Sequence, residues 1–197
     1  IRLSSSSNNL VSGNTATNNY YGVYLQSFSN SNTIHHNNFN NTGQVWSDSV
    51  NAWDHDEEGN CWSDYTGQDK NKDGIGDTPY VINVENQDNR PLMGKYSDFS
   101  VAWKDKTYQA TTICNSTISN LRFEVGRETG NKIMNFDVTS EEGKAGFCRV
   151  MIPTELMNYS YIVLIDEEET IPTLLSVSNN THAYLYFTYA PSSRTIT

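Results

Sequence analysis

The chain has 197 residues and a formal net charge of −10, from 13 Lys and Arg against 23 Asp and Glu. This length accommodates one or two domains. The acidic balance argues against nucleic acid or an anionic membrane as partner, because both require a basic surface. No apolar run approaches the roughly 20 residues of a membrane span. The sequence begins at Ile1 without a signal peptide, so we expect a processed product or a fragment.

The N-terminal segment repeats itself. Its apolar residues alternate, which is typical of strands, and a period of 20–50 residues is typical of a solenoid. The pattern predicts a right-handed parallel β-helix with asparagine ladders at its corners, rather than an unstructured Asn/Ser-rich tail. The motif Asn9-x-Val11-x-x-Asn14-x-Ala16-x-Asn18 returns as Asn32-x-Ile34-x-x-Asn37-x-Phe39-x-Asn41, and Ile1-x-Leu3 returns as Val23-x-Leu25.

Two such repeats do not bury a core alone, because solenoids usually need three or more and polar caps. We therefore expect either further repeats or another molecule against the face that Ile1 opens. The repeat stops near Gln44, where Trp46, Trp53 and Trp62 provide large apolar side chains. We expect these tryptophans to close the end of the solenoid, with a sugar-stacking platform as the alternative.

The segment from Asp69 to Asp77 has oxygen-bearing side chains at alternate positions, with Gly74 after the third. An EF-hand-type loop binds calcium through positions 1, 3, 5, 7 and 9, with glycine at position 6. Position 12 is Tyr80 instead of a bidentate carboxylate, so the loop needs an outside ligand. The sequence predicts a Ca²⁺ site, against the alternative of a solvated turn. Its expected ligands are Asp69, Asn71, Asp73, the Ile75 carbonyl and Asp77, with Asp64 or Asp88 from outside.

Residues 1–95 carry a set of distinctive motifs: Gly59-Asn60-Cys61-Trp62-Ser63-Asp64-Tyr65, the 69–77 loop, Thr78-Pro79-Tyr80 and Asn86-x-Asp88-x-x-Pro91-Leu92-Met93. With these motifs, the segment resembles the end of NosD-like parallel β-helix repeat proteins of archaeal cell surfaces. The resemblance implies a secreted or surface-anchored protein with a metal-dependent C-terminal cap.

NosD itself is tied to copper delivery, but the sequence shows no Cys, Met and His cluster of suitable spacing for copper. His35 and His36 are adjacent on a predicted strand, so we expect them to point to opposite faces and not to share a site.

The second half differs from the first. Residues 96–105 are interpreted as a connector, and residues 106–197 as an immunoglobulin-like β-sandwich. Seven short runs rich in β-branched and aromatic residues predict its strands: Tyr108–Cys114, Leu121–Val125, Ile133–Val138, Phe147–Ile152, Tyr159–Ile165, Leu174–Val177 and Ala183–Tyr189. Ser193–Thr197 is either the last strand of this sandwich or a strand donated to another subunit.

Two motifs stand out in this half: Gly146-Phe147-Cys148-x-Val150-x-Ile152-Pro153 and Thr181-His182-x-Tyr184-Leu185-Tyr186-Phe187. With them, this half resembles the β-domain that often follows such repeats in archaeal surface proteins. The resemblance implies a disulfide between Cys114 and Cys148, which would fit an oxidising compartment. Cys61 is then a buried free thiol or an intermolecular link.

Four Asn-x-Ser/Thr triplets are candidate glycosylation sites, and with the calcium loop they favour an extracellular location at the cell surface. They begin at Asn40, Asn115, Asn158 and Asn179.

The leading functional hypothesis is a non-catalytic, calcium-stabilised structural protein of the cell surface: a filament, sheath or S-layer subunit, or a stalk. Its expected partners are further copies of itself, neighbouring surface proteins or glycans. Catalysis is not expected, because Arg2 is the one charged residue before Asp48 and no nucleophile or phosphate motif occurs. The alternatives are a carbohydrate-binding or adhesion module, and a polysaccharide lyase or hydrolase.

Overall fold

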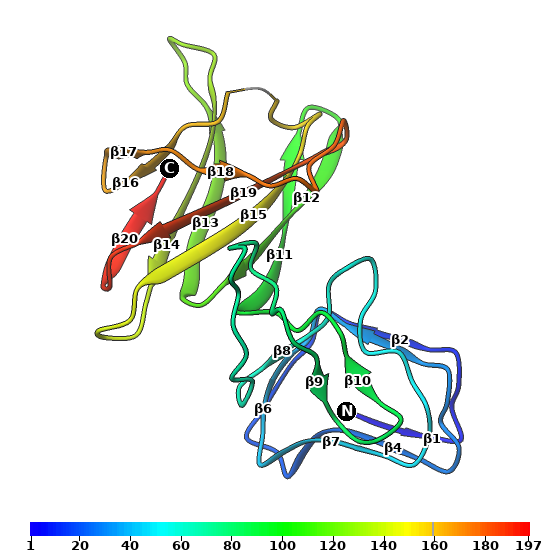
Figure 1. The fold of residues 1–197 in the computed structure, drawn as a ribbon. Helices are drawn as coiled ribbons and strands as arrows, with labels where there is room; N and C mark the ends of the chain where they lie inside the picture. Colours follow the sequence, from blue (N-terminus) through cyan, green and yellow to red (C-terminus); the bar gives the residue numbers. More distant parts are fainter. Residues whose placement is uncertain (159) are drawn as a thin grey trace. The chain divides into compact units, whose positions relative to one another are not determined.

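The structure is a computed structural model that describes residues 1–158 and 160–197. Tyr159, with which one predicted strand begins, lies outside the described residues. The described part contains twenty strands and no helix, which confirms the all-β prediction. The chain divides into two compact units, Ile1–Tyr96 and Ser97–Thr197, each with a core of its own (Figure 1).

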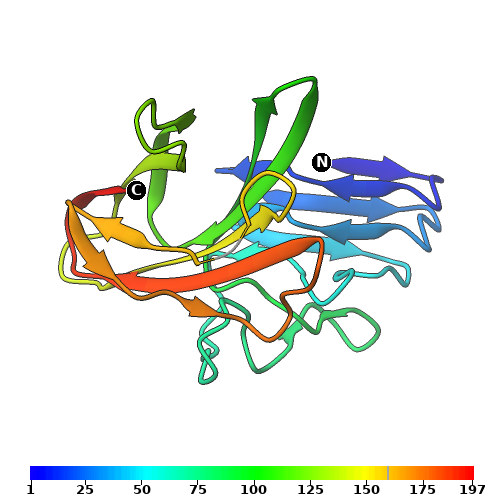
Figure 2. The ribbon, with the colours of Figure 1, turned by 90° about the horizontal axis from the view of Figure 1, so that it is seen from above.

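Unit 1 begins with eight strands that form three parallel sheets. The sheets are β1 (Arg2–Ser4), β4 (Tyr21–Gln26) and β7 (Gly43–Ser47); β2 (Leu10–Ser12) and β5 (Thr33–His35); and β3 (Thr15–Thr17), β6 (Asn38–Asn40) and β8 (Cys61–Trp62). Leu3 lies opposite Leu25, and Val11 opposite Ile34, as the sequence repeat predicts. The chain thus returns to the same strand positions, and we call each return a coil. Figure 2 shows the coils as successive layers.

Two ladders of hydrogen bonds connect the coils at their corners. Backbone and side-chain N–H groups of one asparagine donate to the Oδ1 atom of the asparagine on the next coil, over 2.9–3.1 Å. Because these amides are mostly buried, the bonds satisfy groups that would be costly to bury alone. The ladders run Asn9–Asn32–Asn51–Asn86 and Asn14–Asn37–Asn60–Asp88.

A third, exposed corner corrects one detail of the sequence repeat. The repeat aligns Asn18 with Asn41, but it is Asn19 whose backbone and side-chain amides donate to Asn41 Oδ1. Asn18 instead has a φ of 60° and makes the turn before the corner. The coil is one residue shorter here. In the sheet that follows, Tyr21 therefore lies opposite Gly43 and Val23 opposite Val45, each 22 residues apart.

The end of the coil stack is closed by aromatic side chains and a short antiparallel pair, β9 (Tyr80–Val81) and β10 (Gln87–Asp88). Trp53 and Trp62 are 1% and 3% exposed, and the Trp62 ring stacks on Tyr80 with centroids 4.4 Å apart. Trp46 does not take part, since it stacks on Tyr24 on the partly exposed face of β7.

Unit 2 consists of two five-stranded sheets. One has the order β11 (Lys95–Trp103), β12 (Lys106–Cys114), β15 (Gly146–Pro153), β19 (His182–Tyr189) and β18 (Thr173–Leu174). The other has the order β13 (Thr117–Val125), β14 (Lys132–Thr139), β20 (Ser193–Ile196), β16 (Val163–Ile165) and β17 (Glu168–Thr170). The C-terminal segment is therefore a strand of its own sheet, between β14 and β16.

The prediction that residues 96–105 form a connector is wrong for most of this segment. These residues form edge strand β11 and the turn into β12. Phe99, Val101 and Trp103 face inward while Asp98 and Ser100 are exposed, and Val101 joins a buried cluster with Ala110 and Met134. The period-two burial of this segment is that of a strand with one solvated face.

The disulfide implied by the resemblance is absent. Cys114 and Cys148 lie directly opposite each other on β12 and β15 and are fully buried, yet both are free thiols. The Tyr189 hydroxyl contacts their sulfur atoms at 3.2 Å and 3.8 Å and donates to Ser116 Oγ. The two residues are thus accommodated as small buried side chains around this hydroxyl.

Candidate functional site

The 69–77 loop folds around its own carboxylates. Asp69 accepts hydrogen bonds from the backbone N–H groups of Asp73 and Gly74, at 3.0 Å and 2.8 Å. Asp73 accepts one from Ile75 N–H, and Asp77 one from Lys70 N–H. Gly74 has a φ of 84°, a conformation that favours glycine. The alternating oxygen pattern thus produces a tight loop with its carboxylates turned toward its own backbone.

The electrostatics of this loop favour a cation. Burial is the main cause that raises the pKa of the Asp69 carboxyl, and the neighbouring negative charge of Asp73 raises it further. Asn71 Nδ2 donates to the Asp73 carboxylate at 2.8 Å. All donor atoms in the loop are oxygens, the type that hard cations such as Ca²⁺ prefer.

The two predicted outside ligands, Asp64 and Asp88, accept hydrogen bonds from residues outside the loop. Asp88 is fully buried, and its carboxylate accepts hydrogen bonds from the Asn60 backbone, Trp62 Nε1 and the Arg90 backbone. Asp64 accepts from Gln44 Nε2 and from the Tyr80 hydroxyl. Both predictions were based on closeness in sequence, whereas the closing of the coil stack uses these carboxylates. Across residues 1–158 and 160–197, no three His, Cys, Asp or Glu side chains converge as a metal site requires.

Three of the four histidines gather at one corner of unit 1, contrary to the expectation that His35 and His36 point apart. The ring centroids of His35 and His36 are 4.3 Å apart, and those of His35 and His55 are 5.3 Å apart. His36 Nε2 lies 2.8 Å from Glu58 Oε2, and the His36 ring stacks on Tyr96 at 4.0 Å. We call His35, His36, His55 and Glu58 the histidine corner.

The ring of His36 lies beside that of His35 because of the backbone conformation of His36, whose φ is 58°. This left-handed residue turns the chain at the end of β5, so the alternation of a strand does not apply to it. The residues before other ladder asparagines, Ser31 and Gly13, are left-handed too. Gly13 occupies the same repeat position as His36. That glycine was the sequence signal that could have revealed the turn.

No motif in the sequence pointed to the contribution of His55 and Glu58. Their backbones pair through two hydrogen bonds of 2.9 Å and 3.0 Å, which close a tight turn over Asp56 and Glu57. Both central residues have positive φ, 49° and 68°, although neither is Gly or Asn. This turn type normally selects Gly, Asn or Asp at those positions, so Glu57 is an unusual residue for it.

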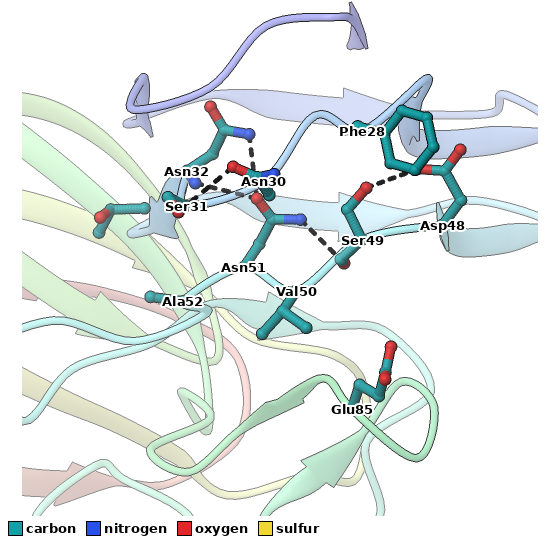
Figure 3. Close-up of a pocket in the computed structure, with 11 residues that line it drawn as sticks. Phe28, Asn30, Ser31, Asn32, Asp48, Ser49, Val50, Asn51, Ala52 and Glu85 are labelled. Carbon is teal, nitrogen blue, oxygen red and sulfur yellow. Dashed lines mark hydrogen bonds between the residues drawn. The ribbon is translucent and has the colours of Figure 1, made fainter.

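A separate groove of about 600 Å³ lies between the turn after β4 and the turn that joins β9 and β10. Figure 3 shows Phe28 beside Asp48 at this groove, with Glu85 nearby. Phe28 is 81% exposed and has a φ of 62°, an outlier for a bulky side chain. The Asp48 carboxylate accepts hydrogen bonds from Ser27 N–H and Ser49 Oγ.

The remaining predicted site residues are dispersed. All four candidate glycosylation residues, Asn40, Asn115, Asn158 and Asn179, are exposed. The Asn115 side chain is engaged, since its amide donates to Ala145 O and its oxygen accepts from Phe147 N–H. Cys61 is a free, half-buried thiol, and burial raises its pKa to about 11, so it is protonated at neutral pH.

Comparison with known proteins agrees with the resemblance for the coils. Residues 1–67 match the family described as periplasmic copper-binding protein (NosD). The protein described as a probable ABC transporter binding protein NosD, from Stutzerimonas stutzeri, is 40% identical over 78 residues, which cover 36% of this chain and 18% of that protein. This chain therefore spans less than a fifth of that relative. No solved structure matches. Among the described residues, no helix is long and apolar enough to cross a membrane.

Proposed function

Proceeding from coils that are similar to those of NosD proteins, we propose that this chain is the non-catalytic, structural end of an exported surface protein, of archaeal cell-surface type. In this proposal unit 1 is the end of a right-handed parallel β-helix, and unit 2 is an immunoglobulin-like sandwich. The observation that carries it is the stack of parallel coils closed by Trp53, Trp62 and the β9–β10 pair. An exported location agrees with the periplasmic description of the matching family.

Calcium would hold the closing segment in this proposal. The donors would come from the loop itself: the side chains of Asp69, Asn71, Asp73 and Asp77 and the Ile75 carbonyl. The loop is already tied to the segment after β10, because Gly76 N–H donates to Pro91 O and Met93 N–H donates to Gly74 O; Leu92 N–H in turn donates to Asn60 O of the coil stack. A divalent cation would offset the repulsion between Asp69 and Asp73.

We propose a non-catalytic role because the clustered carboxylates of unit 1 accept hydrogen bonds that stabilise the fold. Asp88 accepts buried hydrogen bonds, and Asp69, Asp73 and Asp77 accept bonds from the loop backbone. General acid–base chemistry needs titratable groups that can reach a substrate bond. A lyase or hydrolase therefore ranks below the structural role.

Electron microscopy of the purified chain, with calcium and after chelation, tests the structural role. We expect ordered filaments or sheets that loosen when calcium is removed, through contacts with further copies or with neighbouring surface proteins. Asp105→Ala, in an exposed turn of unit 2, is the matched control for Asp73→Ala in the loop. Dispersed monomers under both conditions would contradict a self-assembling subunit.

A carbohydrate-binding role is the second candidate, favoured by the groove at Phe28. An exposed aromatic ring beside carboxylate, amide and hydroxyl groups is suited to stack on a sugar and bind its hydroxyl groups. Strained residues such as Phe28 are found preferentially at binding sites.

We expect Phe28→Ala to abolish retention of the protein in affinity gels that contain surface polysaccharide. Val84→Ala is the control, because Val84 is fully exposed and does not line the groove. Equal mobility of parent and Phe28→Ala at every polysaccharide concentration would exclude this groove as a glycan site.

A further inference from the structure

We propose that the groove at Phe28 binds a linear polysaccharide whose sugar units carry protonated amino groups, such as a polymer of glucosamine. This inference rests on the carbohydrate-binding role given above as the second candidate function, and it adds the chemical class of the sugar. It requires neither calcium nor the 69–77 loop.

The groove extends over three successive layers of the coil stack. Its lining residues Ser31, Val50 and Glu85 each come directly before an asparagine of the ladder that runs from Asn9 to Asn86. The Ser31 backbone N–H donates to Val50 O at 3.0 Å, which joins two of these layers. Neighbouring strands of a sheet lie about 4.7–4.9 Å apart, so three layers offer a linear polymer a row of contacts along the stack.

Apolar side chains of the groove face solvent. Phe28 is 81% exposed and Val50 is 55% exposed. Their apolar surface is suited to contact the CH groups on the face of a sugar ring. These contacts do not depend on the charge of the sugar, so they would be common to every polysaccharide that enters the groove.

The charge of the groove selects among such polysaccharides. Among the described residues that line it, Asp48 and Glu85 carry a charge and none is basic. Asp48 accepts hydrogen bonds from Ser49 Oγ and Ser27 N–H, at 2.6 Å and 2.9 Å. The bond from Ser49 is the main cause that lowers the pKa of the Asp48 carboxyl, so this group is ionised at neutral pH. An anionic groove on a chain of net charge −10 repels sugar acids and attracts ammonium groups.

The two carboxylates belong to different layers. Asp48 follows strand β7, whereas Glu85 lies in the turn that joins β9 and β10. Figure 3 shows them on separate segments of the groove. A polymer with an amino group on each sugar unit would contact both carboxylates at once, whereas a single sugar would contact one. We therefore expect oligomers to bind more tightly than the monomer.

Titration calorimetry of the full chain tests the proposal, at a mildly acidic pH at which the amino groups are protonated. The probes are oligomers of glucosamine, N-acetylglucosamine and galacturonic acid of equal length. We expect the glucosamine oligomer to bind about five- to tenfold more tightly than its acetylated counterpart, because it can pair with both exposed carboxylates. Added salt should weaken this preference, and the galacturonic acid oligomer should not bind.

Glu85→Gln removes one charge and keeps the size of the side chain. We expect it to weaken binding of the glucosamine oligomer by about two- to fivefold and to reduce the preference over the acetylated oligomer. Glu168→Gln, on the exposed part of strand β17 in unit 2, is the matched control and should retain the full preference.

Equal affinities for the glucosamine and N-acetylglucosamine oligomers, or tighter binding of the galacturonic acid oligomer, would overturn the inference and leave the groove a glycan site. The same loss of preference in Glu168→Gln would also overturn it, because the effect would then come from the net charge. Binding of none of the three oligomers would refute the inference and the carbohydrate-binding role together.

Discussion

Asp88 occupies the last position of a ladder that is otherwise built from asparagines. The Asn60 backbone and Trp62 Nε1 donate to its Oδ2 atom at 2.7 Å and 2.8 Å. A carboxylate accepts but does not donate, so the run of amide donors ends here. The adjacent Gly59 is required by this packing, because a Cβ atom on it would lie 1.9 Å from Asp88 Oδ1.

The pH dependence of stability should report on Asp88. Burial raises its pKa from 3.8 to about 6, against the opposing effect of its hydrogen bonds. Between these values the folded chain retains a proton that the unfolded chain has lost, so stability falls as the pH rises. The cost is about 3 kcal/mol for a shift of this size. Urea unfolding from pH 4 to pH 7, followed by tryptophan fluorescence, should show this decline in the parent and not in Asp88→Asn. Parallel profiles would contradict it.

At the residue scale, sequence reasoning failed where a contact depended on distant parts of the chain. The donors that surround Asp88 come from residues up to 28 positions away, so closeness in sequence to the loop did not reveal these hydrogen bonds. The same applies to Cys114 and Cys148, where the pairing of strands was anticipated but the contact of the Tyr189 hydroxyl with both sulfur atoms was not. The position of the His36 ring, in contrast, was accessible from Gly13 one repeat earlier.

At the scale of elements, the coils are specified by their corners as much as by their apolar residues. Asn37 is fully buried, and its amide donates to Val11 O, His35 O and Asn60 Oδ1, while its oxygen accepts from Asn14. Each of these bonds satisfies a group that the coil buries. The alternating apolar and asparagine positions, which recur every 22 or 23 residues, therefore predicted the parallel register.

Truncation of a buried ladder residue should accordingly be costly. We expect Asn37→Ala to lower the free energy of unfolding of unit 1 by about 3 kcal/mol, because it leaves buried carbonyl and amide groups without partners. Asn19→Ala removes a rung of the same geometry at an exposed corner and should cost less than about 1 kcal/mol. Similar losses for the two variants in chemical denaturation would refute a role of burial.

Strand β11 was predicted as a connector, although Phe99, Val101 and Trp103 alternate along it. No strand was predicted at β17, and the predicted run Leu174–Val177 overlaps β18 only at Leu174, because strands of two or three residues have too few positions to show a period. The longer runs, including Phe147–Ile152 and Ala183–Tyr189, fall inside β15 and β19.

At the scale of the whole molecule, the two units have separate cores and a different dependence on calcium is expected. The proposed loop belongs to unit 1, so calcium should raise the melting temperature of that unit alone. At a calcium concentration of about 100 times the Kd, the stabilisation would be about 2.7 kcal/mol. Calorimetry with calcium and with chelator measures this change in the melting temperature of unit 1.

Asp73→Ala should abolish the calcium effect and expose residues 48–95 to protease, while the transition of unit 2 stays unchanged. Asp105→Ala should behave as the parent does. Equal protease sensitivity of Asp73→Ala and parent in this region would show that the loop does not hold the closing segment.

The asparagine ladders also constrain how this chain can change its length. Each rung requires an asparagine at one fixed position per coil, and the same coil must place its apolar residues inward. Within a strand, removal of a single residue would displace both sets at once, whereas removal of a complete turn of 22 or 23 residues would join equivalent corners. The segments between corners vary in length, since Asn32 and Asn51 are 19 residues apart and Asn51 and Asn86 are 35 residues apart. Evolution or protein engineering should therefore change the length of the stack in these connecting segments or by whole turns, with Asp88 kept at the end of its ladder.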